Sequence, residues 1–524
     1  QDVILNPNSF QQTYYVSAQG GSSVARYFAS LGMSKESAAY NPSKDSKYNK
    51  GVGYDTYNYR LNLDIDLTKT TKVYIGTTGY MSVNTRPSMG EYSRGVSLTD
   101  WLWSSQAKTT PISYPLRYSN GYYPAAGTKD EISPYVLLNY TGNAREQNTR
   151  NLVTLGITQD LSMITKGLSA KVQGSWDTQS LFGEARYKMP ELNEALKERN
   201  PNGTLSFEKI ADEKTVTYSS AAWVWRKLYL EANVNYDRTF GDHRLGGLLF
   251  YYIEDTSETG ADKSMNAIPK RYQSLSGRFT YGFKDTYFWD LNFGLNGSEN
   301  FEPGKQYGFF PAGALAWRLS NEDFMQDIPW ISNLKLRLSY GTSGNDRIDA
   351  DLYQKLYGVS SSRPAGWGEN SHYYYNFYNS KYVYNPDVRW ETTITRNIGF
   401  DFGFFKERIS GTVDVYWNTV KDLLVPSDIP GYTGYTKLMT NVGQTSNRGI
   451  ELQLNAWLVE TKDFSLNATF NIGHNKNKID KLASGEKEWI LTSGWRNDVV
   501  NSDDYRAYVG GTSGLIYGYV NDGF

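Results

Sequence analysis

Apolar and polar side chains alternate residue by residue along most of the chain. Residues 57–67 show the pattern clearly: every second residue is large and apolar, and the residues between them are polar or charged. A helix would scatter each set around its axis, whereas a strand places alternate residues on opposite faces. About 16 segments repeat this design over about 10–14 residues each. The pattern predicts an all-β protein.

The length of these segments favours strands that cross a membrane. Strands in soluble sheets are usually about 5–6 residues long, whereas a tilted strand needs about 9–11 residues to span a bilayer. Aromatic residues stand near several predicted strand ends, as interfacial girdles require. They include Tyr57, Trp176, Tyr236, Tyr287, Trp289, Tyr340 and Trp457. The strands of a soluble sandwich or propeller also alternate apolar and polar residues, but they are shorter.

The connections between the predicted strands alternate in length. Short links are expected at Gly20-Gly21, Thr68–Thr71, Gly241-Asp242, Lys284-Asp285, Lys406-Glu407 and Thr461–Asp463. Long ones are expected at about residues 34–55, 84–148, 179–223, 256–269, 343–388 and 419–445, and from 474 onward. An up-and-down outer-membrane barrel has short periplasmic turns and long outer loops. We therefore expect such a transmembrane antiparallel barrel, with about 16 strands present.

The order of short and long connections gives an expectation about the first and last strands of the barrel. The first short link, near Gly20, would be periplasmic, so the strand before it runs downward. A barrel entered from the periplasm begins with an upward strand, and the chain stops at Phe524 inside a long outer segment. Open sheet edges cannot face lipid. We therefore expect residues 1–524 to be part of a barrel domain, with the first strand and the last strands absent.

Composition removes several other classes of function. The formal net charge is −1, with 54 basic and 55 acidic residues, which argues against binding nucleic acid. There is no cysteine, so thiolate sites are excluded. Mean hydropathy is −0.58, which a barrel tolerates because only alternate residues face lipid. The residues after Gln1 show no basic segment followed by an apolar one, so we expect a signal peptide to be absent from this sequence, either cleaved or not included.

Catalytic and metal chemistry is not expected. His243, His372 and His474 are far apart in sequence and show no zinc-binding spacing. Alternating carboxylates such as Asp64 and Asp66 suit a water-facing wall better than a glycosidase pair. Short Asp/Asn/Gly clusters near the end of the chain read as turns rather than calcium loops. We predict no catalytic, cofactor-binding or metal-binding residue.

Aromatic residues crowd the predicted long loops, where flat rings can stack on sugars, hold peptide side chains or bury a partner protein. Packing of the loops against one another is an equally good explanation. The candidate substrate-binding or partner-binding residues are Trp101, Trp103, Tyr122, Tyr123, Trp367, Tyr373, Tyr374 and Tyr375. Tyr114, Tyr118, Tyr378, Tyr432 and Tyr435 lie in the same loops. One loop segment, Met189–Asn200 (MPELNEALKERN), predicts a short helix followed by a turn at Asn202-Gly203.

Several stretches resemble the SusC/RagA family of TonB-dependent outer-membrane proteins of Bacteroidetes-type bacteria. They are GRFTYGFKDTYFWDLNFGLNGSENFEPGKQYGFFPAGALAWRLSNEDFM (277–325), ISNLKLRLSYGTSGND (331–346), RWETTITRNIGFDFGFFKERISGTVDVYWNTVKDLL (389–424) and NVGQTSNRGIELQLN (441–455). Weaker matches are YFASLGM, YRLNLDIDL and GLIYGYVNDGF. The matches run in order along nearly the whole chain.

The resemblance implies a barrel of about 22 strands with an N-terminal plug and a TonB box, neither of which is in this chain. It implies active import of oligosaccharides or oligopeptides across the outer membrane, without covalent chemistry. A SusD-like surface lipoprotein would close over the ligand, and TonB–ExbB–ExbD would act through the absent N-terminal part. We favour oligosaccharides because the loops are rich in aromatic residues. A passive porin and a surface adhesin barrel without active transport remain the alternatives.

Overall fold

The computed structural model describes residues 4–523 with internal gaps. The gaps are residues 38–39, 41–51, 89–114, 126–132, 260–267, 349–351, 355–356, 368–371, 380–381, 434–436, 483–488, 494–504 and 517–522. For residues 357–367, 372–379 and 489–493 only the backbone is described. The chain divides into two compact units, Gln1–Gln159 with Val172–Leu230 and Asp255–Lys270, and Asp160–Lys171 with Glu231–Glu254 and Arg271–Phe524.

Seventeen strands of the described chain belong to one hydrogen-bonded sheet. Sixteen of them are long, which confirms the predicted number. They are β1 (Gln11–Gly21), β2 (Ala25–Ser37), β3 (Gly53–Asp66), β4 (Thr71–Arg86), β6 (Gly142–Asp160), β7 (Leu168–Met189), β10 (Lys214–Phe240), β11 (His243–Thr259), β12 (Lys270–Phe283), β13 (Tyr287–Ser298), β14 (Tyr307–Arg318), β15 (Ile331–Asn345), β19 (Glu391–Phe404), β20 (Ile409–Asp428), β21 (Lys437–Glu460) and β22 (Ser465–Lys481). The seventeenth, β18 (Tyr382–Val383), pairs in parallel with β21.

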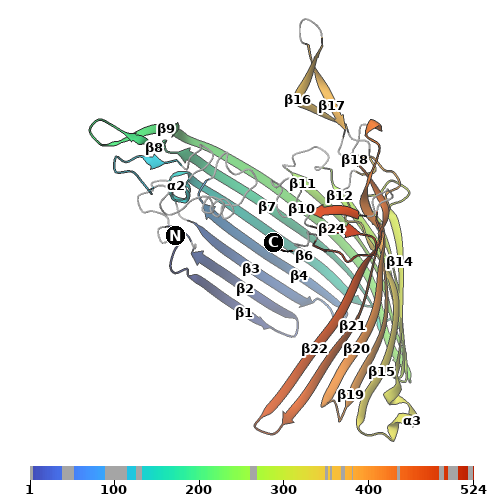
Figure 1. Ribbon diagram of the computed structural model, residues 1–524. Helices are drawn as coiled ribbons and strands as arrows, with labels where there is room; N and C mark the ends of the chain where they lie inside the picture. The colour runs from blue at the N-terminus through green and yellow to red at the C-terminus, as the bar shows by residue number, and fades with distance from the viewer. Residues whose placement is uncertain are drawn as a thin grey trace. The chain divides into compact units, whose positions relative to one another are not determined.

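Neighbouring long strands pair antiparallel in the order of the chain. In the first unit, β1, β2, β3, β4 and β6 form such a series. In the second, β12 to β15 and then β19 to β22 do the same. Figure 1 shows β1 to β4 side by side in blue and β19 to β22 side by side in orange to red. The result is the meander that the alternating sequence predicts.

The two faces of the strands differ in chemistry as predicted. One face, called here the apolar face, carries large side chains that are exposed. In the first unit these include Leu61, Leu155, Ile157, Val172 and Trp176, and in the second Leu249, Leu291, Leu315, Leu338, Ile398, Ile450 and Ile472. The opposite, polar face carries ion pairs between strands. These include Arg26–Asp66, Arg150–Asp177, Lys171–Glu231, Arg278–Asp290 and Arg337–Asp401.

Tight turns join one set of strand ends. They occupy residues 22–24, 67–70, 241–242, 284–286, 405–408 and 461–464, at or next to each predicted short link. The first turn lies just after the predicted Gly20-Gly21, because these two residues end β1. The alternation of length is less strict than expected. The β14–β15 link on the same side is longer and holds the 3-10 helix η3 (Leu319–Asn321) and helix α3 (Asp323–Gln326). Within the described residues, none of the helices is long and apolar enough to span a membrane.

The strands also run further than predicted into the other set of connections. β10 is 27 residues long and β21 is 24, so much of each predicted long loop is an extension of the sheet. Three small sheets stand apart from the main one. They are β5 (Tyr123–Pro124) with β8 (Leu192–Arg199) and β9 (Leu205–Ala211), β16 (Tyr357–Trp367) with β17 (His372–Asn379), and β23 (Trp489–Ser493) with β24 (Tyr505–Tyr508).

The helix predicted at Met189–Asn200 is wrong, because this segment contains strand β8. β8 pairs antiparallel with β9 and parallel with β5. Glu, Leu, Ala and Lys favour a helix locally, but backbone pairing on both sides of β8 outweighs that weak preference. The turn predicted after it is confirmed, with Gly203 at φ +82°, a conformation that favours glycine.

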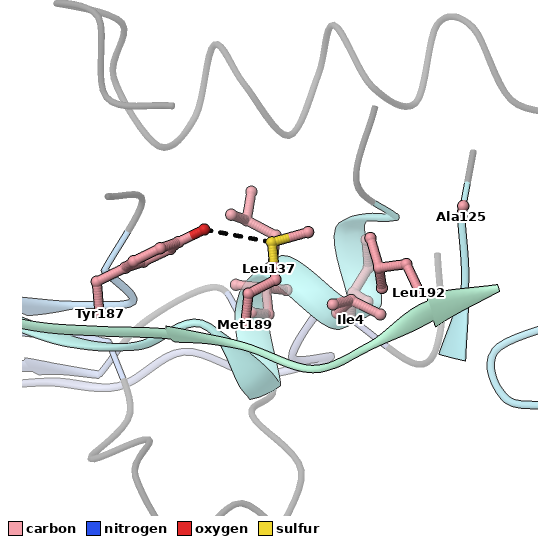
Figure 2. Close-up of a cluster of buried hydrophobic side chains, with 8 residues drawn as sticks. Ile4, Ala125, Leu137, Tyr187, Met189 and Leu192 are labelled. Atoms are coloured by element: carbon pink, nitrogen blue, oxygen red, sulfur yellow. Dashed lines mark hydrogen bonds between the residues drawn. The ribbon is translucent and has the colours of Figure 1, made fainter. Parts of the chain in front are cut away.

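Among the described residues, two clusters of buried apolar side chains lie at the loop ends of the strands. The cluster in the first unit centres on helix α2 (Pro134–Tyr140), whose Val136, Leu137 and Leu138 are almost fully buried. Figure 2 shows Leu137 with Ile4, Met189 and Leu192, and the hydrogen bond from Tyr187 Oη to Met189 Sδ (3.2 Å). The second cluster contains Phe301, Phe310, Leu352, Val388 and Trp390.

Candidate functional site

A turn in the first unit brings the candidates Tyr122 and Tyr123 close to Tyr118 of the same loop. Tyr118 N donates to Tyr122 O (2.9 Å), and Gly121 N donates to Tyr118 O (2.9 Å). Gly121 has φ +92°, so a side chain there would strain the turn. Asn120 Oδ1 accepts from Tyr122 N (3.1 Å). The sequence Tyr-Ser-Asn-Gly-Tyr-Tyr thus folds into a tight loop that displays its tyrosines at both ends.

Phe207 on β9 receives two of these tyrosines. The ring of Tyr118 meets Phe207 edge-on at 4.9 Å between centroids, and the ring of Tyr122 does so at 5.4 Å. Tyr118 Oη also accepts a hydrogen bond from Ala195 N on β8 (3.3 Å). Edge-to-face contacts of this kind add to the burial of apolar area. Tyr122 nevertheless keeps 42% of its surface exposed, so part of its ring remains free to contact a ligand.

Tyr123 has a different environment, although it is the next residue. Its backbone pairs with Leu192 on β8, and its ring packs on Tyr140 of α2 at 4.5 Å between centroids. The guanidinium of Arg117 lies over the ring at 5.1 Å. Burial raises the pKa of Tyr140, and a hydrogen bond with Tyr123 raises it further. Tyr123 is therefore mainly a packing residue, joined to the buried cluster around α2.

The local sequence explains how α2 comes to support Tyr123. Ser133 Oγ accepts a hydrogen bond from Val136 N (3.2 Å), and Pro134 follows as the first helical residue. Serine at the N-cap and proline at the next position are a typical helix start. This signal was not used above, so both α2 and its ring contacts, Tyr135 and Tyr140, were missed. Phe207 was missed because a lone phenylalanine in a polar stretch gives no pattern.

Of the other candidate residues, four share the β16–β17 hairpin and two lie outside the described residues. Trp101 and Trp103 lie outside the described residues, as do Tyr114 and Tyr435. Trp367 ends β16, where its backbone pairs with His372, and Tyr373 and Tyr374 pair with Gly366 and Ala365. Tyr375 follows in the same strand, β17. Only the backbone is described there, so a role in binding stays a prediction for these four. Tyr432 is 91% exposed in the 3-10 helix η4 (Gly431–Thr433).

A network of polar contacts lies at the loop ends of strands in the second unit. Arg389 Nη2 donates to Asp422 Oδ1 (2.6 Å), and Asn441 Nδ2 donates to the carbonyl oxygens of Arg389 (2.9 Å) and Asp422 (2.7 Å). Nearby, Lys305 Nζ lies 2.7 Å from Asp387 Oδ1. That hydrogen bond and the charge of Lys305 lower the pKa of Asp387. These contacts fix loop backbone and leave little for a ligand to use.

The described residues contain no group of three or more His, Asp or Glu that could hold a metal ion. His243 Nδ1 shares a hydrogen bond with Tyr281 Oη (2.7 Å) and packs on Phe283. His474 pairs through its backbone with Ile450. Both histidines lie in strands of the main sheet.

Comparisons with known proteins agree with this geometry. Residues 39–521 match the family model described as TonB dependent receptor-like, beta-barrel. The chain is 24% identical over 515 residues to TonB-dependent receptor P3 of Formosa agariphila, covering 94% of this chain and 48% of that protein. It is 34% identical over 251 residues to TonB-dependent receptor SusC of Bacteroides thetaiotaomicron, covering 47% of this chain and 25% of that protein.

Solved structures show the same fold. The RagAB peptide transporter gives a TM-score of 0.71 at 21% identity, over 95% of this chain and 53% of that one. The RagAB peptide importer in its open-open state gives 0.73 at 20% identity, over 97% and 53%. This chain thus spans about half of the length of these proteins, or less, and the likeness in structure concerns the fold alone.

Proposed function

Because the chain belongs to the TonB dependent receptor-like β-barrel family of the outer membrane, we propose that the whole protein imports oligosaccharides actively. Oligopeptides are the second substrate class. The family consists of transport receptors, and the predicted barrel and SusC/RagA resemblance are confirmed by the family match and the relatives. The proposal adds a substrate class, an energy source and a partner.

The two-faced sheet is the observation that supports transport best. The exposed apolar face suits contact with lipid chains. The opposite face carries cross-strand ion pairs such as Arg150–Asp177 and Arg278–Asp290, with other polar groups between them. Hydrated oligomers can pass along such a wall by exchanging hydrogen bonds with water for hydrogen bonds with protein.

The exposed aromatic rings at the loop ends support sugars as the ligand. Tyr122 presents an exposed ring that Phe207 holds in place, and a rigid flat ring is a good surface for the C–H face of a sugar. The peptide alternative has its own support, because the solved structures that share this fold are titled as a peptide transporter and importer. Identity of 20–21% carries no substrate from those proteins to this one.

The partners follow from the family and from the resemblance. TonB, with ExbB and ExbD, would act through an N-terminal segment outside this chain. A SusD-like lipoprotein would close over the loop ends, where the tyrosine turn and the β8–β9 hairpin offer aromatic and backbone contacts. Tyr and Trp are favoured residues in such interfaces, so part of the predicted aromatic set would contact the lipoprotein rather than the sugar.

The test is uptake by cells that carry the full-length protein. A deletion strain is complemented with wild type or with Tyr122→Ala, and given labelled oligosaccharides or oligopeptides of matched size. The proposal expects saturable oligosaccharide uptake that stops when the proton gradient is collapsed or TonB is removed, and weaker uptake with Tyr122→Ala. Uptake that survives without TonB would identify a passive porin. Surface binding with no uptake would identify an adhesin, and uptake of peptides alone would overturn the substrate class.

A further inference from the structure

The apolar face of β1, β2, β3, β4 and β6 contains a groove that is large enough to hold part of a ligand. Its volume is about 550 Å³, and its lining residues all belong to the first unit. Two adjacent rows across the five strands form it. One row is Tyr14, Met33, Tyr57, Met81 and Thr149, and the next is Val16, Leu31, Tyr59, Gly79 and Asn151.

Gly79 creates the depth of this groove. An ideal Cβ at Gly79 would stand 1.9 Å from Cε1 of Tyr59, so any side chain there would displace the ring. With glycine, the Tyr59 ring lies down over β4, and its hydroxyl donates to Asn151 Oδ1 on β6 (3.2 Å). Leu31 and Val16 remain 67% and 71% exposed beside it. The tyrosine is thus tied down as one wall, and the apolar side chains of β1 and β2 form the other.

The groove sits where the apolar face meets the loop ends. Towards the tight turns, β6 continues with exposed Val153, Leu155 and Ile157 on the same face. Towards the loops it continues with Gln147 and Arg145. Tyrosines at such a boundary mark a membrane interface. Because tight turns are periplasmic in outer-membrane barrels, the groove faces the outer leaflet.

Charge above the groove favours an anionic lipid. Lys35 follows Met33 on the same face of β2, and Arg145 lies two rows above Thr149 on β6; both residues are exposed. Asp55 stands opposite Lys35 in the register, which leaves one positive charge in excess among these three. Basic residues beside a membrane surface bind lipid headgroups that carry phosphate.

We propose that this groove binds lipid A, the phosphorylated and acylated glycolipid of the outer leaflet. One acyl chain would lie in the groove between Leu31 and Tyr59, and the phosphorylated headgroup above it would extend from Lys35 on β2 towards Arg145 on β6. The apolar lining excludes a hydrated sugar or peptide as the occupant, because their polar groups would lose hydrogen bonds to water without replacement. The site therefore stands apart from the import path and does not depend on the substrate class.

Native mass spectrometry of the purified full-length protein, titrated with lipid A, tests the proposal. Leu31→Trp fills the groove and should weaken lipid A binding about tenfold, the effect of about two methylene groups losing their burial. Leu155→Trp adds the same ring to the same face outside the groove and should bind like wild type. Lys35→Gln combined with Arg145→Gln should weaken lipid A binding while leaving binding of phosphatidylethanolamine unchanged.

Folding of each variant is checked by its heat-dependent migration on a gel. Should Leu31→Trp fail to migrate as a folded barrel, Val16→Trp fills the same groove from β1. Wild-type affinity in a folded, groove-filled variant overturns the site. A groove-filled variant that keeps its lipid and loses a dimer would show instead that a second copy of the chain occupies the groove, which also overturns the proposal. Equal weakening of both lipids by the double substitution would overturn the phosphate contact.

Discussion

Arg337 forms an ion pair with Asp414 although another strand lies between them. Arg337 Nη2 is 3.1 Å from Asp414 Oδ2, and the two residues stand on β15 and β20, on either side of β19. The residue of β19 in register with both is Gly399. An ideal Cβ at Gly399 would lie 2.6 Å from both Arg337 Cζ and Asp414 Oδ1. The missing side chain therefore lets the guanidinium reach across.

Gly399→Ala should break this contact while leaving the backbone pairing in place. Arg337 would keep its bond to Asp401 (2.8 Å) and lose Asp414, at a cost of about 1–2 kcal/mol for one charge-assisted hydrogen bond. Denaturant unfolding, followed by tryptophan fluorescence, measures the difference. Gly183→Ala on β7 is the control, because its Cβ would find only ordinary contact at 3.8 Å. Equal stability of the two variants would show that the cross-strand ion pair contributes nothing.

The assignment of the two faces predicts opposite effects for a charge at adjacent positions. Leu155 on β6 is 53% exposed on the apolar face, and Thr154 before it points to the polar face. Arginine in place of Leu155 should cost about 2–4 kcal/mol in a membrane if the site lies near midplane, whereas Thr154→Arg should cost less than about 1 kcal/mol. Folding into liposomes from urea reports both values. A larger loss from Thr154→Arg would reverse the assignment of the faces.

Strand number and face chemistry could be predicted from sequence because the strand period of two is local. The alternation with adjacent residues indicates which face of the sheet a side chain occupies, as at Tyr57, Arg60 and Leu63. The ends of the strands could not be predicted, because β10 and β21 continue into segments whose side chains no longer alternate between lipid and water. There the extension depends on hydrogen bonds to the neighbouring strand, which are nonlocal.

In the candidate site, too, local sequence predicted some features, whereas others depend on contacts with distant residues. Aromatic richness drew attention to Tyr122 and Tyr123, whose roles in binding stay predictions, but composition could not separate an exposed ring from a packed one. That distinction depends on Phe207 and Tyr140, which come from β9 and α2. The misassigned segment 189–200 fails for the same reason, since its strand exists only through pairing with β5 and β9.

The structure predicts that neighbouring tyrosines have separable roles. Tyr123→Ala removes ring contacts with Tyr140 and Arg117 and should destabilise the loop region by about 2 kcal/mol, somewhat below the cost of a fully buried aromatic. Tyr122→Ala should cost less than about 1 kcal/mol but should weaken ligand binding. Hydrogen exchange of the α2 amides and oligosaccharide binding to the full-length protein measure the two effects. Faster exchange with Tyr122→Ala than with Tyr123→Ala would contradict this division.

Asp422 gives the last prediction, because its backbone adopts φ +58° inside a bulge of β20. Glycine takes this conformation freely, whereas an ordinary residue pays about 1–2 kcal/mol. Glycine also loses about 0.5–1 kcal/mol of backbone entropy on folding relative to alanine. Asp422→Gly should therefore be more stable than Asp422→Ala by about 0.5–1 kcal/mol, the difference between these two effects.

Both substitutions remove the hydrogen bond from Arg389 equally. The difference between their free energies of unfolding therefore measures the cost of the backbone conformation alone. That ion pair is largely exposed, with 58% of the Arg389 side chain accessible, and contributes little by itself. Asp422→Asn is the matched control, since asparagine tolerates positive φ and retains an acceptor for Arg389. It should unfold at a denaturant concentration close to wild type. If Asp422→Ala proved as stable as Asp422→Gly, the bulge would have relaxed to negative φ, and the contacts of Asn441 with Arg389 and Asp422 would not fix this backbone.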